Sequence, residues 1–208
     1  MKTEQEYTRD LTEIRSMMER STKFLPLAGW SGIMIGLYAL VGVYIADRLM
    51  NIEGGVVVYN TLEKQEITAS VLHLFLLGTG ILVLAIGTAV FLSYRKSKKI
   101  NERLWNSAAR RLVVNMAIPL CTGGLLILIL MAKGLLGLIL PLTLIFYGLT
   151  LLNASKITYE EIKYLGFIEI VLGLVAAYFI EYGLIFWAIG FGIMHIVYGI
   201  YLHLRYEK

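Results

Sequence analysis

Six long apolar segments constrain this chain more than any other feature of its sequence. Each has roughly 18–26 residues, which is enough for an α-helix rising ~1.5 Å per residue to cross a hydrocarbon core of ~30 Å. We therefore predict an all-α, polytopic membrane protein in which residues 24–208 form a bundle of six transmembrane helices. The predicted helices are 24–46, 69–94, 112–132, 135–153, 163–180 and 183–204.

The composition supports a membrane bundle built as one domain. The chain has 208 residues, 58% of them hydrophobic, and a mean hydropathy of +0.71, which is too apolar for a soluble fold of this length. Twenty glycines against three prolines suit closely packed membrane helices. The single cysteine, Cys121, excludes an intramolecular disulfide and a thiolate metal cluster, and we expect it to be a small core residue.

Lysine and arginine gather in the stretches that six alternating crossings place on one side. That side holds residues 1–23, 95–111, 154–162 and the C-terminus, with 16 of the 19 basic residues when Lys163 is included. Because positive charge is retained in the cytoplasm, we predict a bacterial inner-membrane protein with cytoplasmic N- and C-termini.

The same basic residues predict a face that binds anionic lipid head groups or a protein partner. Topology and lipid attraction account for the net charge of +4, so nucleic acid is not an expected partner. The predicted face consists of Arg15, Arg20, Lys23, Arg95, Lys96, Lys98, Lys99, Arg103, Arg110 and Arg111.

Residues 1–23 show the pattern of an amphipathic helix without a cleavable signal peptide. Thr3 and Glu6 have the spacing of a capping box, and an apolar stripe follows at Tyr7, Leu11, Ile14 and Met18. Such a helix lies on the inner leaflet of the membrane, or it docks a partner or forms a lid over the cytoplasmic end. A second capping box is predicted at Thr158 and Glu161, and the 95–111 loop is predicted to be helical.

Short connections predict that the helices form three antiparallel hairpins. The connections near Lys133 and near Glu181 and Tyr182 have only a few residues. A faint repeat at an offset of 112 supports related hairpins, although glycine-rich helices also produce such matches by chance. The repeat pairs Gly78, Gly80, Gly87 and Tyr94 with Gly190, Gly192, Gly199 and Tyr206.

Glu169 and His195 are the most informative residues within the apolar segments. A carboxylate at membrane depth is costly unless it is paired, hydrated or protonated. Each residue shares its helix face with small residues, which marks a helix contact rather than a lipid-facing surface. The pair is predicted either to hold the last hairpin together or to titrate protons and bind substrate from the cytoplasm.

Four other polar residues, Ser31, Asn115, Tyr147 and Tyr198, fall at a similar depth and would line a polar pocket if they converge with the pair. Pro119 and Pro141 lie within apolar segments, where they kink the helices or break them beside a cavity.

Other site chemistries fit the sequence poorly. Haem would need two histidines at one depth, whereas His73 and His195 lie at different depths. Gly29-Trp30-Ser31-Gly32 looks like the Gly-x-Ser-Gly motif of rhomboid proteases, but the serine lies on the first segment rather than the fourth. No phosphate loop, dinucleotide fingerprint or metal-ligand spacing is present in the sequence, so we expect no metal, no cofactor and no enzymatic activity.

Two stretches carry a resemblance to known proteins. Residues 14–21 (Ile-Arg-Ser-Met-Met-Glu-Arg-Ser) and 186–192 (Phe-Trp-Ala-Ile-Gly-Phe-Gly) resemble uncharacterised small bacterial membrane proteins with six helices. The architecture also looks loosely like that of acid-stress membrane proteins built from helical hairpins. These resemblances imply a membrane bundle and bring no site residues.

The sequence therefore favours a non-enzymatic membrane protein with a structural, stress-related or partner-regulating role. The alternative is a small-solute or proton-coupled transporter, or a channel, that uses Glu169 and His195. Self-association or a membrane or cytoplasmic partner fits either interpretation.

Overall fold

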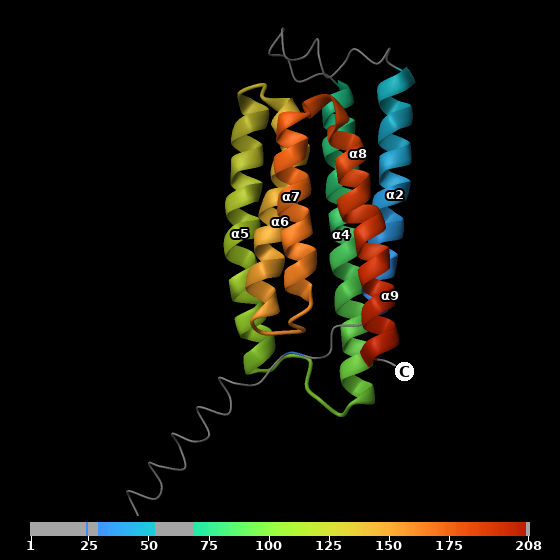
Figure 1. The fold of residues 1–208 in the computed structure, drawn as a ribbon, viewed down its shortest axis with the longest axis vertical. Coiled ribbons are helices and arrows are strands. Elements are labelled where there is room, and N and C mark those ends of the chain that lie inside the picture. The colour runs from blue at the N-terminus through green and yellow to red at the C-terminus, as the bar shows by residue number, and fades with distance from the viewer. Residues whose placement is uncertain (1–23, 25–28, 53–68, 207–208) are drawn as a thin grey trace, which may run out of the picture.

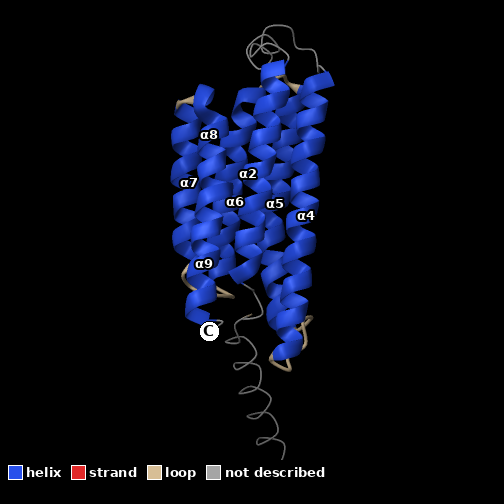
Figure 2. Ribbon diagram, turned by 90° about the vertical axis from the view of Figure 1, so that its right-hand side faces the viewer, coloured by secondary structure: helices blue, strands red, loops and turns tan. Residues whose placement is uncertain are grey.

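The computed structural model describes residue 24, residues 29–52 and residues 69–206 of the chain (Figure 1). The predictions for the amphipathic helix 1–23, including Arg15, Arg20 and Lys23, lie outside the described residues. In the part of the chain that is described, the secondary structure is helical and contains no strand (Figure 2). The prediction of an all-α protein is confirmed at this level.

The helices of the described chain lie side by side and run alternately up and down (Figure 1). Among the described residues, five segments are long enough and apolar enough to cross a membrane: Gly29–Leu49, Leu72–Lys99, Ser107–Ala132, Leu136–Ser155 and Ile180–Tyr206. The first four are found in helices α2 (Gly29–Ile52), α4 (Ala69–Lys99), α5 (Ser107–Ala132) and α6 (Ile139–Ser155, preceded by the 3-10 turn η1, Leu136–Leu138). Helix α7 (Ile162–Tyr178) has 17 residues and is the shorter sixth member.

The last helix of the bundle is composite. The 3-10 turn η2 (Ile180–Tyr182) leads into α8 (Gly183–Trp187), the π-helix η3 (Ala188–Met194) and α9 (His195–Tyr206). Its α8 part contacts α6 and α7, while η3 and α9 lie against α2. Helix α6 packs on both α5 and α7, and α4 packs on α2.

Several helix ends differ from their predicted positions. Helix α2 begins at Gly29 rather than at residue 24, α4 continues to Lys99, and α5 begins at Ser107. Residues 100–106 are not helical, which corrects the prediction of a helical 95–111 loop. Asn106 explains the early start of α5, because its side-chain Oδ1 accepts a 2.8 Å hydrogen bond from the Ala109 backbone N–H.

The predicted capping box at Thr158 and Glu161 is wrong. The Thr158 side chain is fully buried, and its hydroxyl donates to the Phe24 carbonyl at 2.7 Å. The Phe24 N–H in turn donates to the Ile157 carbonyl at 2.7 Å. The Thr158 hydroxyl therefore bonds to a residue that is distant in the sequence, and it does not cap the start of α7 as the sequence pattern predicted.

Neither membrane-depth proline breaks its helix. Helix α5 continues through Pro119 to Ala132. Pro141 is the third residue of α6, where the missing N–H would have no acceptor within the helix. The irregular backbone lies instead in the π-helix Ala188–Met194, which contains no proline.

Glycines let two helix pairs approach backbone to backbone. A Cβ added to Gly148 of α6 would lie 2.6 Å from the Gly166 carbonyl oxygen of α7, and one on Gly166 would lie 2.7 Å from the Gly148 oxygen. Gly29 of α2 and Gly199 of α9 have the same relation, at 2.7 Å in each direction. Small residues therefore mark helix contacts in these pairs, as the sequence predicted.

Helix α4 and the outer side of α5 are different. No residue in the most apolar window of Leu72–Lys99 is buried. Cys121 of α5 is also exposed, which corrects the expectation of a core position. Apolar side chains on these surfaces face outward because no further helix of the described chain covers them.

Candidate functional site

The centre of the bundle holds a buried acid and a buried base. Glu169 of α7 has 0% of its surface exposed, and His195, the first residue of α9, has 3%. The Glu169 Oε1 and His195 Nδ1 atoms are 3.5 Å apart. The two residues that the sequence placed on small-residue faces therefore meet.

Both ring nitrogens of His195 have a partner. Nδ1 lies 3.0 Å from the Gly190 carbonyl oxygen, and Nε2 lies 2.8 Å from the Tyr147 hydroxyl. A carbonyl oxygen can only accept, so Nδ1 carries a proton. In the neutral imidazole, Nε2 then accepts a hydrogen bond from Tyr147. The site is a connected series from Tyr147 through His195 to Glu169.

The π-helix shapes this site. His195 follows directly after the π-helix Ala188–Met194, and its ring reaches back to the carbonyl of Gly190 within it. A Cβ on Gly190 would collide with the Glu169 Oε2 atom and lie 2.7 Å from Leu144 Cδ2. Gly190 therefore provides the space that the carboxyl group occupies. π-Helical turns are frequent at functional sites.

Glu169 lacks a hydrogen-bond donor in the described structure. Neither carboxyl oxygen has a hydrogen-bond partner, and His195 is 3.5 Å away with its Nδ1 proton directed to Gly190. A lone ionised carboxylate in such an interior costs several kcal/mol or more. The low-energy forms are thus a neutral acid beside neutral imidazole, or a carboxylate beside imidazolium. Both forms carry the same number of protons.

Aromatic rings pack along one side of the site. The Phe191 ring centroid lies 4.8 Å from Trp187, 4.9 Å from Tyr147 and 5.8 Å from His195. The Trp187 Nε1–H donates to the Thr143 hydroxyl at 3.2 Å, which ties the stack to α6. These rings lie between the pair and the end of the bundle that contains the α7–α8 turn.

The other residues of the predicted pocket do not all converge. Asn115 is exposed on α5, where its side chain donates to the Arg111 carbonyl at 2.8 Å, so its inclusion was wrong. Ser31 is buried in α2. Because Gly190 and Tyr147 occupy both ring nitrogens of His195, the serine–histidine dyad of a protease is not formed here.

Tyr198 lies beside the site without touching the acid. It is half-buried on α9 and packs, together with Tyr147, against a cluster of Leu151, Tyr159, Ile162 and Leu165. Sequence reasoning identified Glu169, His195, Tyr147 and Tyr198 but missed the π-helix and Gly190. The signal was present as two glycines, Gly190 and Gly192, just ahead of the buried histidine.

The described residues of the predicted basic face lie at the end of α4, in residues 100–106 and at the start of α5, at the end of the bundle where α9 finishes with Tyr206 (Figure 1). We call this end the C-terminal end. Lys98 lies 4.6 Å from the Tyr94 ring centroid and Arg95 lies 6.0 Å from that of Phe91. Five of these residues are exposed, Arg95, Lys98, Lys99, Arg103 and Arg110, and two are half-buried, Lys96 and Arg111.

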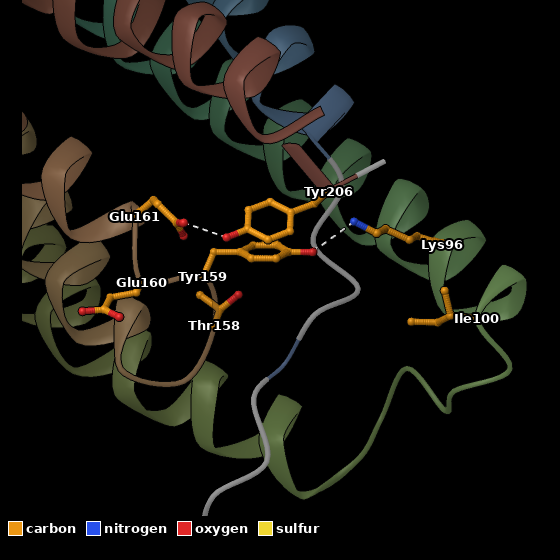
Figure 3. A pocket seen from close by; sticks show the side chains of 7 residues that line it. All are labelled: Lys96, Ile100, Thr158, Tyr159, Glu160, Glu161 and Tyr206. Carbon is orange, nitrogen blue, oxygen red and sulfur yellow. Dashed lines mark hydrogen bonds between the residues drawn. The ribbon is translucent and has the colours of Figure 1, made fainter. Parts of the chain in front are cut away.

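A cavity of about 410 Å³ opens at the C-terminal end (Figure 3). The Lys96 ammonium donates to the Tyr159 hydroxyl at 3.2 Å, and the Tyr206 hydroxyl donates to Glu161 Oε1 at 2.6 Å. The Tyr159 and Tyr206 rings stack with centroids 4.4 Å apart. The lining residues are Lys96, Ile100, Thr158, Tyr159, Glu160, Glu161 and Tyr206.

Comparison with protein-family models, with curated proteins and with solved structures finds no match to this chain. Among the described residues, no group of three or more His, Cys, Asp or Glu side chains is placed to hold a metal ion.

Proposed function

We propose that this chain is a non-enzymatic integral membrane protein whose conformation responds to the protonation of the Glu169–His195 pair. The observation that carries the proposal is Glu169 itself: it is fully buried, and neither of its oxygens accepts a hydrogen bond within the described structure. Intramembrane ionisable residues of this kind are costly to retain and commonly serve a proton-linked role.

The proton content of the pair is coupled to the packing around it. With its proton present, the pair has no net charge in either low-energy form. When the proton leaves, a single negative charge remains among Leu144, Gly190 and His195, where only hydration or a shift of α8 and α9 can stabilise it. Because that charge raises the free energy of the present arrangement, losing the proton favours a second arrangement of the helices in which the charge is better stabilised.

The apolar helices and the basic end support a location in the membrane. The six helices would cross a bacterial inner membrane with both termini in the cytoplasm. Lysines and arginines at the C-terminal end of the bundle would contact anionic head groups there. A protonation-dependent change would then be read out by lipid or by a partner at this end, which is the stress-related, partner-regulating role expected from the sequence.

Proton-coupled transport by the same pair is the second candidate. The π-helix beside Glu169 favours it, because irregular backbone within a membrane helix is tolerated where it lines a pathway. Transport needs the pair to reach both sides of the membrane in turn, whereas a sensor needs access from one side only.

Infrared difference spectroscopy on the protein in lipid nanodiscs tests the proposal. A shift of pH should change a carboxylic C=O band in wild type, and Glu169→Gln should remove that band. Tryptophan fluorescence should change in parallel, since Trp187 belongs to the aromatic stack beside the pair. A spectrum without any band that depends on Glu169 would overturn the proposal.

A flux assay separates the two candidates. Liposomes containing the protein and a pH-sensitive dye should show no proton leak above that of protein-free liposomes if the chain is a sensor. A leak that Glu169→Gln abolishes would instead establish the transport function.

A further inference from the structure

We infer that the cavity at the C-terminal end is the access route by which protons reach Glu169 and His195, with Tyr198 and Tyr147 as the hydroxyl groups along the way. The inference rests on the proposed function, because it assigns a route to the same pair. It is argued from an asymmetry. On one side of the pair lies the ring stack of Phe191 and Trp187, and on the other side lie three tyrosines in a packed group that borders the cavity.

The side with the ring stack is the one toward the α7–α8 turn. Phe191 stacks near His195 with an interplanar angle of 19° and contacts Trp187 at 4.8 Å. The Trp187 N–H, the polar group of that stack, is bonded to the Thr143 hydroxyl, whose own proton goes to the Leu140 carbonyl at 2.7 Å. These hydrogen bonds run within the stack and α6 and give no path to Glu169.

On the other side, one packed group of residues lies between the cavity and the histidine. Tyr159 lines the cavity and belongs to the buried cluster with Leu151, Ile162 and Leu165. Tyr147 and Tyr198 pack on that cluster, and the Tyr147 hydroxyl is hydrogen-bonded to His195 Nε2. Three phenol groups therefore lie between the cavity and the pair, in one packed group of residues.

The mouth of this route carries its own proton-handling groups (Figure 3). The Glu161 carboxylate accepts from the Tyr206 hydroxyl at 2.6 Å and lies 3.4 Å from Arg205 Nη1. Glu161 and Glu160 are among the residues that line the cavity (Figure 3). The Glu161 carboxylate can exchange a proton with water in the cavity.

The transfer is balanced without a further reactant. A hydronium ion from the cavity gives one proton to the Tyr147 oxygen, directly or through Tyr198, as the Tyr147 proton passes to Nε2. The Nδ1 proton then passes to Glu169 Oε1 over the 3.5 Å gap. Water is left behind, the acid is neutral, and imidazole has exchanged its tautomer. Nδ1 now faces the Gly190 carbonyl without a proton, which disfavours the present geometry of the π-helix.

The titratable groups that face Glu169 come from two neighbouring elements. His195 comes from α9 at 3.5 Å, and Tyr147 comes from α6 through its bond to His195. Both belong to the route, so each substitution along it should change the rate of protonation before it changes the structure.

The test measures sidedness first and needs no variant. In proteoliposomes of uniform orientation, a pH jump on the side of the C-terminal end should produce the Glu169 infrared band at least about tenfold faster than a jump on the opposite side. Equal rates from both sides, or a faster response from the opposite side, would overturn the inference.

Variants along the route supply the second measurement. Tyr198→Phe and Glu161→Gln should each slow the appearance of the band by about threefold to tenfold, with the same final amplitude. The matched control is Tyr178→Phe, a tyrosine that is 82% exposed at the far end of α7, and its rate should equal that of wild type. Unchanged rates in both route variants would contradict the route.

The two failures are distinguishable. If wild type gives no band that depends on Glu169, the proposed function fails and the route has nothing to serve. If the band is present but follows the opposite side or ignores the variants, the function stands and the route is wrong. A variant that does not fold is recognised by its thermal unfolding and leaves the sidedness measurement in force.

Discussion

Glycine has different roles in the α6–α7 contact and in helix α4. Gly148 and Gly166 stand where an added Cβ would meet backbone oxygen at 2.6 and 2.7 Å. Gly78, Gly80 and Gly87 of α4 have nothing within 4 Å of an added Cβ. Glycine is thus a packing requirement in one region and only a flexible residue in the other. Its energetic meaning comes from the neighbouring helix rather than from its own sequence context.

The largest expected effect lies in the tight region. Gly148→Ala places a methyl group 2.6 Å from the Gly166 carbonyl oxygen and 2.9 Å from the Ile170 backbone nitrogen, neither of which can rotate away. We expect the free energy of unfolding to fall by about 3 kcal/mol, which is at the upper end of the cost of inserting a methyl group into a packed core. Thermal unfolding in detergent should show a fall of roughly 6–12 °C. A change below about 1 °C would show that α6 and α7 are less tightly joined than described.

A smaller loss is expected at Gly190, because its neighbour is a side chain. The Cβ of Gly190→Ala would collide with the Glu169 carboxyl group, which can move at the cost of its place beside His195. We expect Gly190→Ala to lower the free energy of unfolding by about 1–2 kcal/mol. The loss should be smaller in a background with Glu169→Ala, because the carboxyl group that the new methyl group would meet is then absent. A double-mutant cycle measures this coupling. Strict additivity of the two substitutions would show that Gly190 does not hold space for the acid.

Glu169→Gln should be close to neutral at acidic pH. It keeps the shape of the side chain and removes a charge that no donor stabilises, so stability should be equal to that of wild type or higher by about 1 kcal/mol. As the pH rises, wild type should lose stability relative to the variant, because the unfolded chain releases the carboxyl proton while the buried group in the folded state retains it. A loss of more than about 2 kcal/mol on substitution at every pH would identify Glu169 as a structural partner of His195 instead.

The smallest effect is expected on α4. Gly87→Ala has open space for its methyl group and lowers the backbone entropy of the unfolded chain, so a gain of roughly 0.5 kcal/mol is expected. Thermal unfolding in detergent, under the conditions used for Gly148→Ala, measures this gain. A clear loss would mean that another molecule packs on this face, and the oligomeric state should then be measured.

Sequence patterns predicted the fold well where hydrophobicity decides it. Six apolar segments became six helices, and the small-residue faces of Glu169 and His195 correctly placed both residues at helix contacts. The helix ends were missed where a single hydrogen bond decides, as with Asn106 capping α5 and Thr158 bonding to Phe24. Those choices depend on which groups meet in space, and a local pattern does not contain that information.

The candidate site was predicted in part for the same reason. Depth along a helix is encoded by position, so Tyr147 and His195 could be matched before the structure was known. The direction around a helix is encoded less well, and Asn115 points outward although it lies at a suitable depth. The repeat at an offset of 112 shows the limit clearly. Gly192 packs tightly against Leu40, while its counterpart Gly80 faces open space.

The two parts of the composite last helix pack on different neighbours. Its α8 part faces α6 and α7, and its α9 part faces α2, with the π-helix Ala188–Met194 between them. The hydrogen bonds of a π-helix span one more residue than those of an α-helix. The π-helix therefore rotates the side chains of α9 by about 100° around the helix axis, relative to an uninterrupted α-helix. Deleting one residue from it would turn His203 and Gly199 away from α2 while leaving α8 in place. His195, which meets Glu169 of α7, follows this π-helix directly, so a change of one residue in winding would alter how α9 is aligned on α2.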